Sequence, residues 1–199
     1  MKQLMIASGN KGKIKEFRDM FEPYGIEVRS LADYEGQLPD VEETGDTFFE
    51  NARLKAETIC EIVQTPVLAD DSGLSIDALN GAPGVYSARY AGEPTNDVNN
   101  YEKVLQELTD VPEEERHAKF ICVLAVARPG KETVYFEGNC PGKIAFAPEG
   151  DNGFGYDPIF IPEGYKQTMA QLEATEKNSI SHRHHALEKL NIWLASNYI

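Results

Sequence analysis

The fold class is decided by one stretch near the N-terminus, Leu4-Met5-Ile6-Ala7-Ser8-Gly9-Asn10-Lys11-Gly12-Lys13. Its first four residues are all apolar, which predicts a short strand buried on both faces. A polar turn with two glycines follows, and Ile14, Phe17 and Phe21 then recur at helical spacing. A buried strand, a glycine turn and an amphipathic helix in succession are typical of α/β proteins, which bind ligands at the carboxyl ends of their strands.

The rest of the chain continues this alternation of apolar runs and amphipathic stretches. A capping box, Thr47-Phe48-Phe49-Glu50, opens a helix whose apolar stripe ends at Val63. Ser181 is a suitable N-cap for a last helix. Further strands are expected at residues 26–30, 66–69, 117–127 and 132–138, a helix at 96–108, an extended acidic segment at 38–44, and loops at 81–92 and 150–158. Without linkers or repeats, residues 1–199 are predicted to form a single α/β domain.

Composition excludes several classes of partner. The chain has 19 lysines and arginines against 33 acidic residues, a formal net charge of −14. Nucleic acid and anionic membranes bind to clustered positive charge, so neither is an expected partner. No apolar run approaches the roughly 20 residues needed to span a bilayer. The first apolar run is too short for a signal peptide, and Cys60, Cys122 and Cys140 suggest no disulfide framework, which together predict a cytoplasmic protein.

The turn at residues 8–13 has the composition of an anion site. Glycines let the backbone approach a ligand, and N–H groups of the following helix point toward it. Lys11 and Lys13 add positive charge at that point. The stretch matches neither the Walker A pattern nor the dinucleotide fingerprint. An ordinary turn with solvated lysines is the alternative.

Adjacent acidic residues, Asp70 and Asp71, are expected directly after the strand at residues 66–69. Their mutual repulsion is costly unless a cation or hydrogen-bond donors offset it. A divalent ion is the usual solution, and Mg²⁺ favours one or two carboxylates together with substrate phosphates. Neighbouring residues of an extended chain point in opposite directions, so one carboxylate is expected at the metal while the other fixes local structure. Glu42 and Glu43 are further candidate ligands. The alternative is that the two aspartates form a helix cap or turn.

A third polar group combines the segments 153–158 and 181–185. Phe154 lies between glycines and offers a stacking face for a planar base. His182 and Arg183, at a helix start, are donors for keto oxygens or phosphate. The alternative for the aromatic residues is packing in the core. The nearby histidines lack the acidic or cysteine neighbours of a typical metal site.

Taken together, the segments resemble the inosine triphosphate pyrophosphatase family, also called the Ham1 or RdgB-type noncanonical purine nucleoside triphosphate pyrophosphatases. The resemblance covers nearly the whole chain, and the motifs occur in the same order as in the family. Its motifs are Ser8-Gly9-Asn10-Lys11-Gly12-Lys13, Glu42-Glu43-Thr44-Gly45, Phe49-Glu50-Asn51-Ala52 with Leu54-Lys55-Ala56, Ala69-Asp70-Asp71-Ser72-Gly73-Leu74, Gly81-Ala82-Pro83-Gly84-Val85-Tyr86-Ser87-Ala88-Arg89-Tyr90, Gly153-Phe154-Gly155-Tyr156-Asp157-Pro158 and Ser179-Ile180-Ser181-His182-Arg183. Ser8 replaces the threonine of many members and keeps the hydroxyl, whereas His184 and His185 are outside the motif and have no assigned role.

The resemblance implies hydrolysis of ITP, XTP and their deoxy forms to the monophosphate and pyrophosphate, which clears these nucleotides from the pool. It implies an α/β fold with a mixed, bent central sheet flanked by helices, in two lobes with an active-site cleft between them. It also implies Mg²⁺ as cofactor and a homodimer.

Roles follow for individual residues. The catalytic candidates are Asp71, Lys13 and Lys55. The metal candidates are Asp71, Glu43 and Glu42. The substrate-binding candidates are Ser8, Gly9, Asn10, Lys11, Gly12, Lys13, Ser72, Phe154, Gly155, Tyr156, Asp157, Lys177, His182 and Arg183.

The predicted mechanism divides the substrate between these residues. Lys11, Lys13, Lys55, Lys177 and Mg²⁺ neutralise the triphosphate, while Asp71 orients or deprotonates the attacking water. His182, Arg183 and backbone N–H groups of residues 154–157 donate to the 6-oxo group, which adenine lacks. Three alternatives remain: a pyrophosphatase for another modified base such as a methylated pyrimidine, a nucleotide-binding regulator without catalysis, and a purely structural interaction module.

Overall fold

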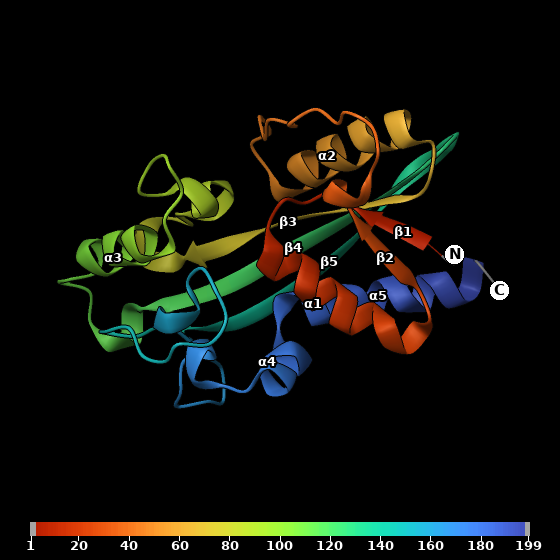
Figure 1. The fold of residues 1–199 in the computed structure, drawn as a ribbon. Coiled ribbons are helices and arrows are strands. Elements are labelled where there is room, and N and C mark those ends of the chain that lie inside the picture. Colours follow the sequence, from red (N-terminus) through yellow and green to blue (C-terminus); the bar gives the residue numbers. More distant parts are fainter. Residues whose placement is uncertain (1–2, 198–199) are drawn as a thin grey trace. The chain divides into compact units, whose positions relative to one another are not determined.

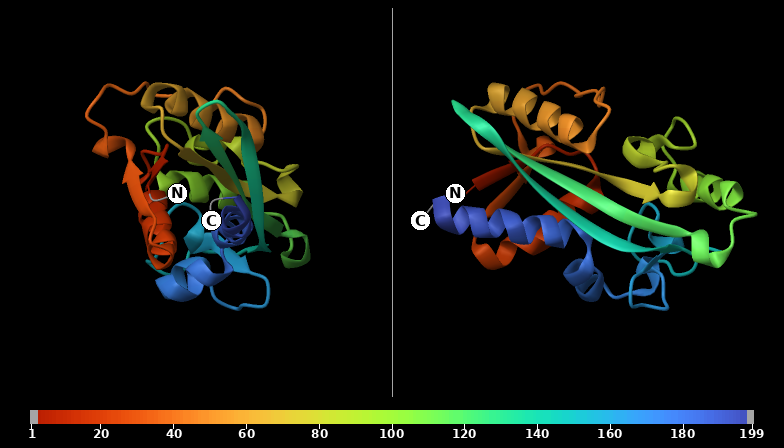
Figure 2. Two further views of the ribbon diagram at one scale, coloured as in Figure 1. Left: turned by 90° about the vertical axis from the view of Figure 1, so that its right-hand side faces the viewer. Right: turned by 180° about the vertical axis from the view of Figure 1, so that it is seen from behind.

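The computed structural model describes residues 3–197, and these form two compact units (Figures 1 and 2). Unit 1 contains residues 3–71, 122–137 and 186–197, and unit 2 contains residues 72–121 and 138–185. The single domain predicted over residues 1–199 stays a prediction, and its first two and last two residues lie outside the described part.

Six strands of the described chain form one sheet in the order β2-β1-β3-β4-β5-β6. β1 pairs in parallel with β2 and with β3, whereas β5 and β6 are antiparallel, so the sheet is mixed as expected. The strand bounds are β1 Gln3–Ile6, β2 Glu27–Ser30, β3 Val67–Ile76, β4 His117–Arg128, β5 Lys131–Ile144 and β6 Phe160–Pro162.

In unit 1, helices cover both faces of the strands (Figure 1). α2 (Phe48–Val63) packs on one face, against alternate strand residues that include Met5, Val67 and Ala69. α1 (Lys11–Phe21) and the part of α5 (His182–Asn197) within this unit pack on the other face, against residues that include Leu68 and Cys122. The predicted capping box at the start of α2 is confirmed. This layering places successive residues of β3 opposite different helices.

Unit 2 has one apolar core of its own. It joins Leu74 and Ile76 of β3 to Phe120 of β4, Phe160 of β6 and the inner face of α3 (Asp97–Glu107). The short helix α4 (Ala174–Ile180) belongs to the same unit. Within residues 81–92, where a loop was expected, residues 84–89 form a 3₁₀ helix.

The main departure from the predicted elements is the length of β3. The expected strand at residues 66–69 continues to Ile76, so Asp70 and Asp71 lie in its interior and form neither its end, a turn nor a helix cap. A buried strand tolerates adjacent carboxylates only when partners offset their charge. Lys13 and Lys55 supply those partners, so the strand continues. No helix among residues 3–197 is long and apolar enough to span a membrane.

Candidate functional site

The glycine turn of unit 1 has the predicted strand-turn-helix geometry. The side chain of Asn10 caps α1 by accepting a hydrogen bond from the Lys13 N–H at 3.1 Å. The Ser8 hydroxyl accepts one from the Asn10 N–H, also at 3.1 Å. A side chain placed at Gly9 would meet no heavy atom within 4 Å among the residues considered, so this part of the turn is open. Lys11 and Gly12 lie in the first turn of α1, and Lys11 is exposed.

The two aspartates of β3 point to opposite faces of the sheet, as expected for an extended chain. Asp70 forms an ion pair with Lys13 of α1. Its other carboxylate oxygen accepts a hydrogen bond from the thiol of Cys122 on β4, at 3.1 Å. On the opposite face, Asp71 Oδ1 lies 3.5 Å from Lys55 Nζ of α2. Each aspartate therefore has a lysine from a different helix layer.

Lys55 gathers three acceptors around one ammonium group. It contacts Glu43 Oε1 at 2.5 Å and donates to the backbone carbonyl of Asp70 at 2.8 Å, in addition to its ion pair with Asp71. Burial alone would lower the pKa of Lys55, but the carboxylates of Asp71 and Glu43 outweigh it and the pKa is raised. Lys55 is therefore firmly cationic.

The pKa of Asp71 is strongly perturbed. Burial raises its pKa to about 6; Lys55 acts against that rise, and the negative charge of Glu43 adds to it. Asp71 Oδ2 is buried and accepts no hydrogen bond from any residue between 3 and 197. A buried carboxylate oxygen without a partner fits a divalent cation, for which carboxylates are suitable hard ligands.

The acids are not assembled as a complete metal site. The described residues contain no cluster of three or more histidine, cysteine, aspartate or glutamate side chains that could hold a metal ion. Glu43 is brought to Lys55, whereas Glu42 is exposed to solvent. The oxygen chemistry of Asp71 and Glu43 fits Mg²⁺, and the metal roles of all three acids stay predictions.

In unit 2, the segment around Phe154 is fixed by Asp157. One oxygen of Asp157 accepts hydrogen bonds from the Phe154 N–H at 2.9 Å and from Lys177 Nζ at 2.7 Å. The positive φ of Gly153, 77°, suits glycine, and a Cβ there would lie only 2.0 Å from the Asp157 carboxylate. Lys177 Nζ and Arg183 Cζ lie 4.8 and 5.5 Å from the centre of the Phe154 ring. Phe154 thus has two cations beside it.

The start of α5 supplies the other predicted base-binding groups. Ser181 caps the helix by accepting a hydrogen bond from the His184 N–H at 3.2 Å, as predicted. The His182 ring stacks on Phe120 at a centroid distance of 4.9 Å and an interplanar angle of 14°. Arg183 Nη2 donates to the Ser72 hydroxyl at 2.9 Å. The side chains of His182 and Arg183 are therefore both buried and fixed by contacts with neighbouring residues.

Three groups that were predicted to bind the substrate have partners within the protein. The backbone N–H groups proposed as donors to the base are largely engaged already. That of Phe154 donates to Asp157, and that of Gly155 donates to Asp97 Oδ2 at 2.8 Å. Lys177 belongs to unit 2, where its Nζ lies 2.7 Å from Asp157 Oδ2, and its role toward the triphosphate stays a prediction. Tyr156 is buried, and its hydroxyl donates to a backbone carbonyl at 2.7 Å, so its side chain belongs to the core.

Two residues in these contacts were missed by sequence reasoning. Asp97 looks only like a first-turn acid of a helix, and its bond to Gly155 links residues 58 positions apart. Cys122 was interpreted as a small core residue; it is buried, as expected, but its thiol also contacts a site carboxylate.

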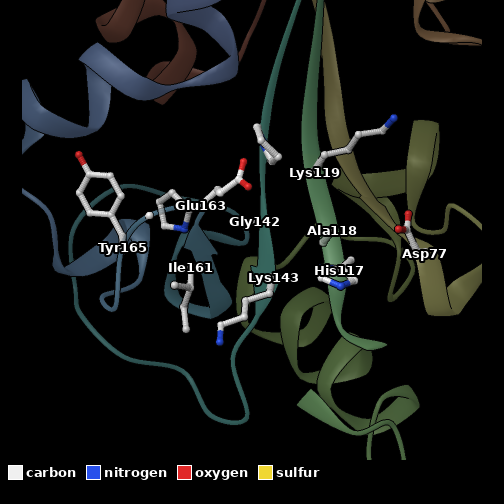
Figure 3. Close-up of a pocket in the computed structure, with 12 residues that line it drawn as sticks. Asp77, His117, Ala118, Lys119, Gly142, Lys143, Ile161, Glu163 and Tyr165 are labelled. Atoms are coloured by element: carbon white, nitrogen blue, oxygen red, sulfur yellow. The ribbon is translucent and has the colours of Figure 1, made fainter. Parts of the chain in front are cut away.

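Unit 2 also has a pocket of about 500 Å³ that contains none of the predicted residues (Figure 3). β4, β5 and β6 contribute to its lining. Both signs of charge occur there, with Lys119 and Lys143 against Asp77 and Glu163. Nothing in that mixture favours a particular ligand.

Comparison with known proteins agrees with the motifs. A sequence profile described as the Ham1 family matches residues 4–193. The dITP/XTP pyrophosphatase of Oceanobacillus iheyensis is 59% identical, with 98% of each chain covered, and that of Halalkalibacterium halodurans is 55% identical, covering 98% of this chain and all of the relative. The solved Ham1 protein of Staphylococcus aureus has a TM-score of 0.87 at 45% identity, covering 98% of this chain and 99% of the other. The chain therefore belongs to the Ham1 family.

Proposed function

We propose that this protein hydrolyses noncanonical purine nucleoside triphosphates, namely ITP, XTP and their deoxy forms, to the monophosphate and pyrophosphate. The names of its relatives support this activity. The observation that carries it is the buried Asp71 carboxylate, which has one oxygen beside Lys55 and the other without a partner in the described chain.

The charge of the unit 1 group explains why a metal is needed. Two lysines, Lys13 and Lys55, stand among three carboxylates, those of Asp70, Asp71 and Glu43. With every carboxyl ionised, the group has a net charge of −1, which repels a triphosphate. One divalent cation would reverse the sign of the group.

We assign Mg²⁺ to Asp71 and Glu43, with Glu42 as a further oxygen ligand. When bound, Mg²⁺ would neutralise phosphate charge and acidify a nearby water. Asp71 orients or deprotonates the attacking water. A metal-bound carboxylate is a weak base, so positioning and charge neutralisation supply most of the rate gain. Lys13 and Lys55, together with Lys11 and the turn at residues 8–13, position the phosphates and stabilise the charge that develops on them.

Recognition of the base is assigned to unit 2. Phe154 stacks on the base, and Arg183 and His182 donate to the 6-oxo oxygen. Ser72 and Phe120 fix the directions of those two donors. Adenine presents an amino donor at the same position and would leave the donors unpaired.

Phosphate and base residues are joined closely in the chain. Asp71 ends the part of β3 that belongs to unit 1, and Ser72 begins the part that belongs to unit 2. One peptide bond therefore connects the proposed catalytic carboxylate with the residue that holds Arg183. We also propose a homodimer and a cytoplasmic location, which the family resemblance implies.

Pyrophosphate release with Mg²⁺ tests the proposed function. ITP, XTP and dITP should be turned over far faster than ATP, GTP and dUTP. Asp71→Asn should abolish turnover while the protein stays folded. Preferential turnover of a pyrimidine triphosphate would favour a different modified base, and stabilisation by ITP without pyrophosphate release would favour a regulator. If no nucleotide raises the melting temperature, the remaining interpretation is a purely structural interaction module.

A further inference from the structure

Asn51 of α2 is a buried polar residue that the proposed mechanism does not use. It is 0% exposed, and its Oδ1 accepts a hydrogen bond from the Gly45 N–H at 2.7 Å. Its Nδ2 is also buried and donates to no group in the described part of the chain. A buried amide donor without a partner lowers stability. Within residues 3–197, the hydrogen bond from Gly45 is the polar interaction of the Asn51 side chain that offsets this cost.

Gly45 fits closely against the start of α2. A Cβ at this position would lie 2.6 Å from Glu50 Cβ and 2.8 Å from Asn51 Oδ1. The next two residues are bound to the same helix turn, since Glu50 Oε2 accepts hydrogen bonds from the Asp46 and Thr47 N–H groups at 2.9 and 3.1 Å. The acidic segment is thus attached to α2 at its C-terminal end.

This attachment has a direct effect on Glu43, which lies two residues before Gly45. Glu43 itself belongs to no helix or strand. Its carboxylate meets Lys55, which follows Asn51 by four residues and therefore lies on the same side of α2. The acidic segment therefore makes two contacts with one face of α2. The backbone N–H of Gly45 binds Asn51, and the carboxylate of Glu43 binds Lys55.

We propose that Asn51 is a positioning residue that places Glu43 beside Lys55 and Asp71, and so sets the affinity of this group for a divalent cation. This inference rests on the proposed function, because it takes Glu43 to be a metal ligand. Without the bond to Asn51, Glu43 samples more positions, and bringing it to the cation costs conformational entropy. Residues that orient metal ligands typically change metal affinity by about 10–100-fold when replaced.

Two variants remove the bond from opposite sides. Asn51→Ala deletes the acceptor, and Gly45→Ala pushes the segment away through its added Cβ. Asn100→Ala is a matched control from α3, since Asn100 is also buried and its Oδ1 accepts a hydrogen bond from the Ala91 N–H at 2.7 Å.

The test is a Mg²⁺ titration followed by thermal unfolding without nucleotide, repeated as pyrophosphate release from ITP. Asn51→Ala and Gly45→Ala should raise the Mg²⁺ midpoint about ten-fold in both assays, with turnover largely restored at saturating Mg²⁺. The control should unfold at a lower temperature with an unchanged midpoint.

The outcomes separate this inference from the proposed function. If the wild type responds to Mg²⁺ and hydrolyses ITP while both bond-breaking variants keep its midpoint, the positioning role is wrong. A ten-fold change that also appears in the control would equally contradict it, because the effect would then be general loss of stability. If the wild type neither responds to Mg²⁺ nor releases pyrophosphate, the proposed function itself fails.

Discussion

Replacing Asp71 by asparagine should make the metal-free protein more stable while removing its activity. Folding raises the pKa of this carboxyl from an ordinary value of 3.8 to about 6, chiefly because the group is buried. The folded state therefore favours the protonated carboxyl. Its stabilising contribution is fully present below pH 4 and is lost as the pH rises through 6. Asparagine is neutral at every pH and avoids that loss.

The size of the effect follows from the two pKa values. Their separation corresponds to about 3 kcal/mol once the carboxyl is fully ionised in the folded protein. About half of that difference is already expected at pH 5. In a chain of this length, about 3 kcal/mol corresponds to an increase of roughly 6–12 °C in melting temperature.

Urea denaturation followed by circular dichroism, in EDTA at pH 5, 6.5 and 8, measures this difference. The advantage of Asp71→Asn should grow with pH and level off above pH 7, and added Mg²⁺ should stabilise the wild type but not the variant. Asp33→Asn is a control in which the change in stability should have the opposite sign. Hydrogen bonds from Ser30 lower the pKa of Asp33, so replacing this carboxylate should lower the free energy of unfolding above pH 4. Equal stability of Asp71→Asn and wild type across this range would refute the burial argument.

Three further predictions concern other contacts. Phe154→Ala should raise the KM for ITP and leave the Mg²⁺ midpoint unchanged in pyrophosphate-release assays; a change confined to Mg²⁺ would contradict the stacking role. Arg183→Lys loses the planar donor that reaches Ser72 and should reduce the ITP/ATP ratio of kcat/KM by at least about ten-fold, the equivalent of one charged hydrogen bond. Cys122→Val removes the thiol donor to Asp70 and should lower stability by about 1 kcal/mol in calorimetry, whereas Cys122→Ser should restore most of it; identical melting of both would count against that bond.

Local patterns predicted those parts of the fold that depend on near neighbours in the chain. The Thr47 capping box and the Ser181 cap each involve residues three positions apart, so the sequence contains the whole interaction. The opposite directions of Asp70 and Asp71 also follow from the two-residue period of a strand. These features needed no knowledge of tertiary contacts.

Parts of the site that depend on distant residues were beyond the same reasoning. The extension of β3 past Asp70 requires lysines from two other elements, and composition cannot show that they converge on it. The bond between Arg183 and Ser72 joins residues 111 positions apart. Asp97 binds the N–H of Gly155, which the sequence had suggested as free for a ligand. A backbone donor can be assigned to a substrate only after its partners within the protein are known.

The extension of β3 also has a consequence for the chemistry. At a strand end, both aspartates would reach solvent and their charges would be screened by water. Inside the strand, each carboxylate is buried and faces a lysine from a different helix layer, so electrostatic effects are strong. The two oxygens of Asp70 contact Lys13 and the Cys122 thiol. Asp71 has one buried oxygen that accepts no hydrogen bond from residues 3–197. The same burial that destabilises an ionised Asp71 therefore leaves it ready to bind a cation or accept a proton, which is why the gain in stability and the loss of activity should appear together in Asp71→Asn.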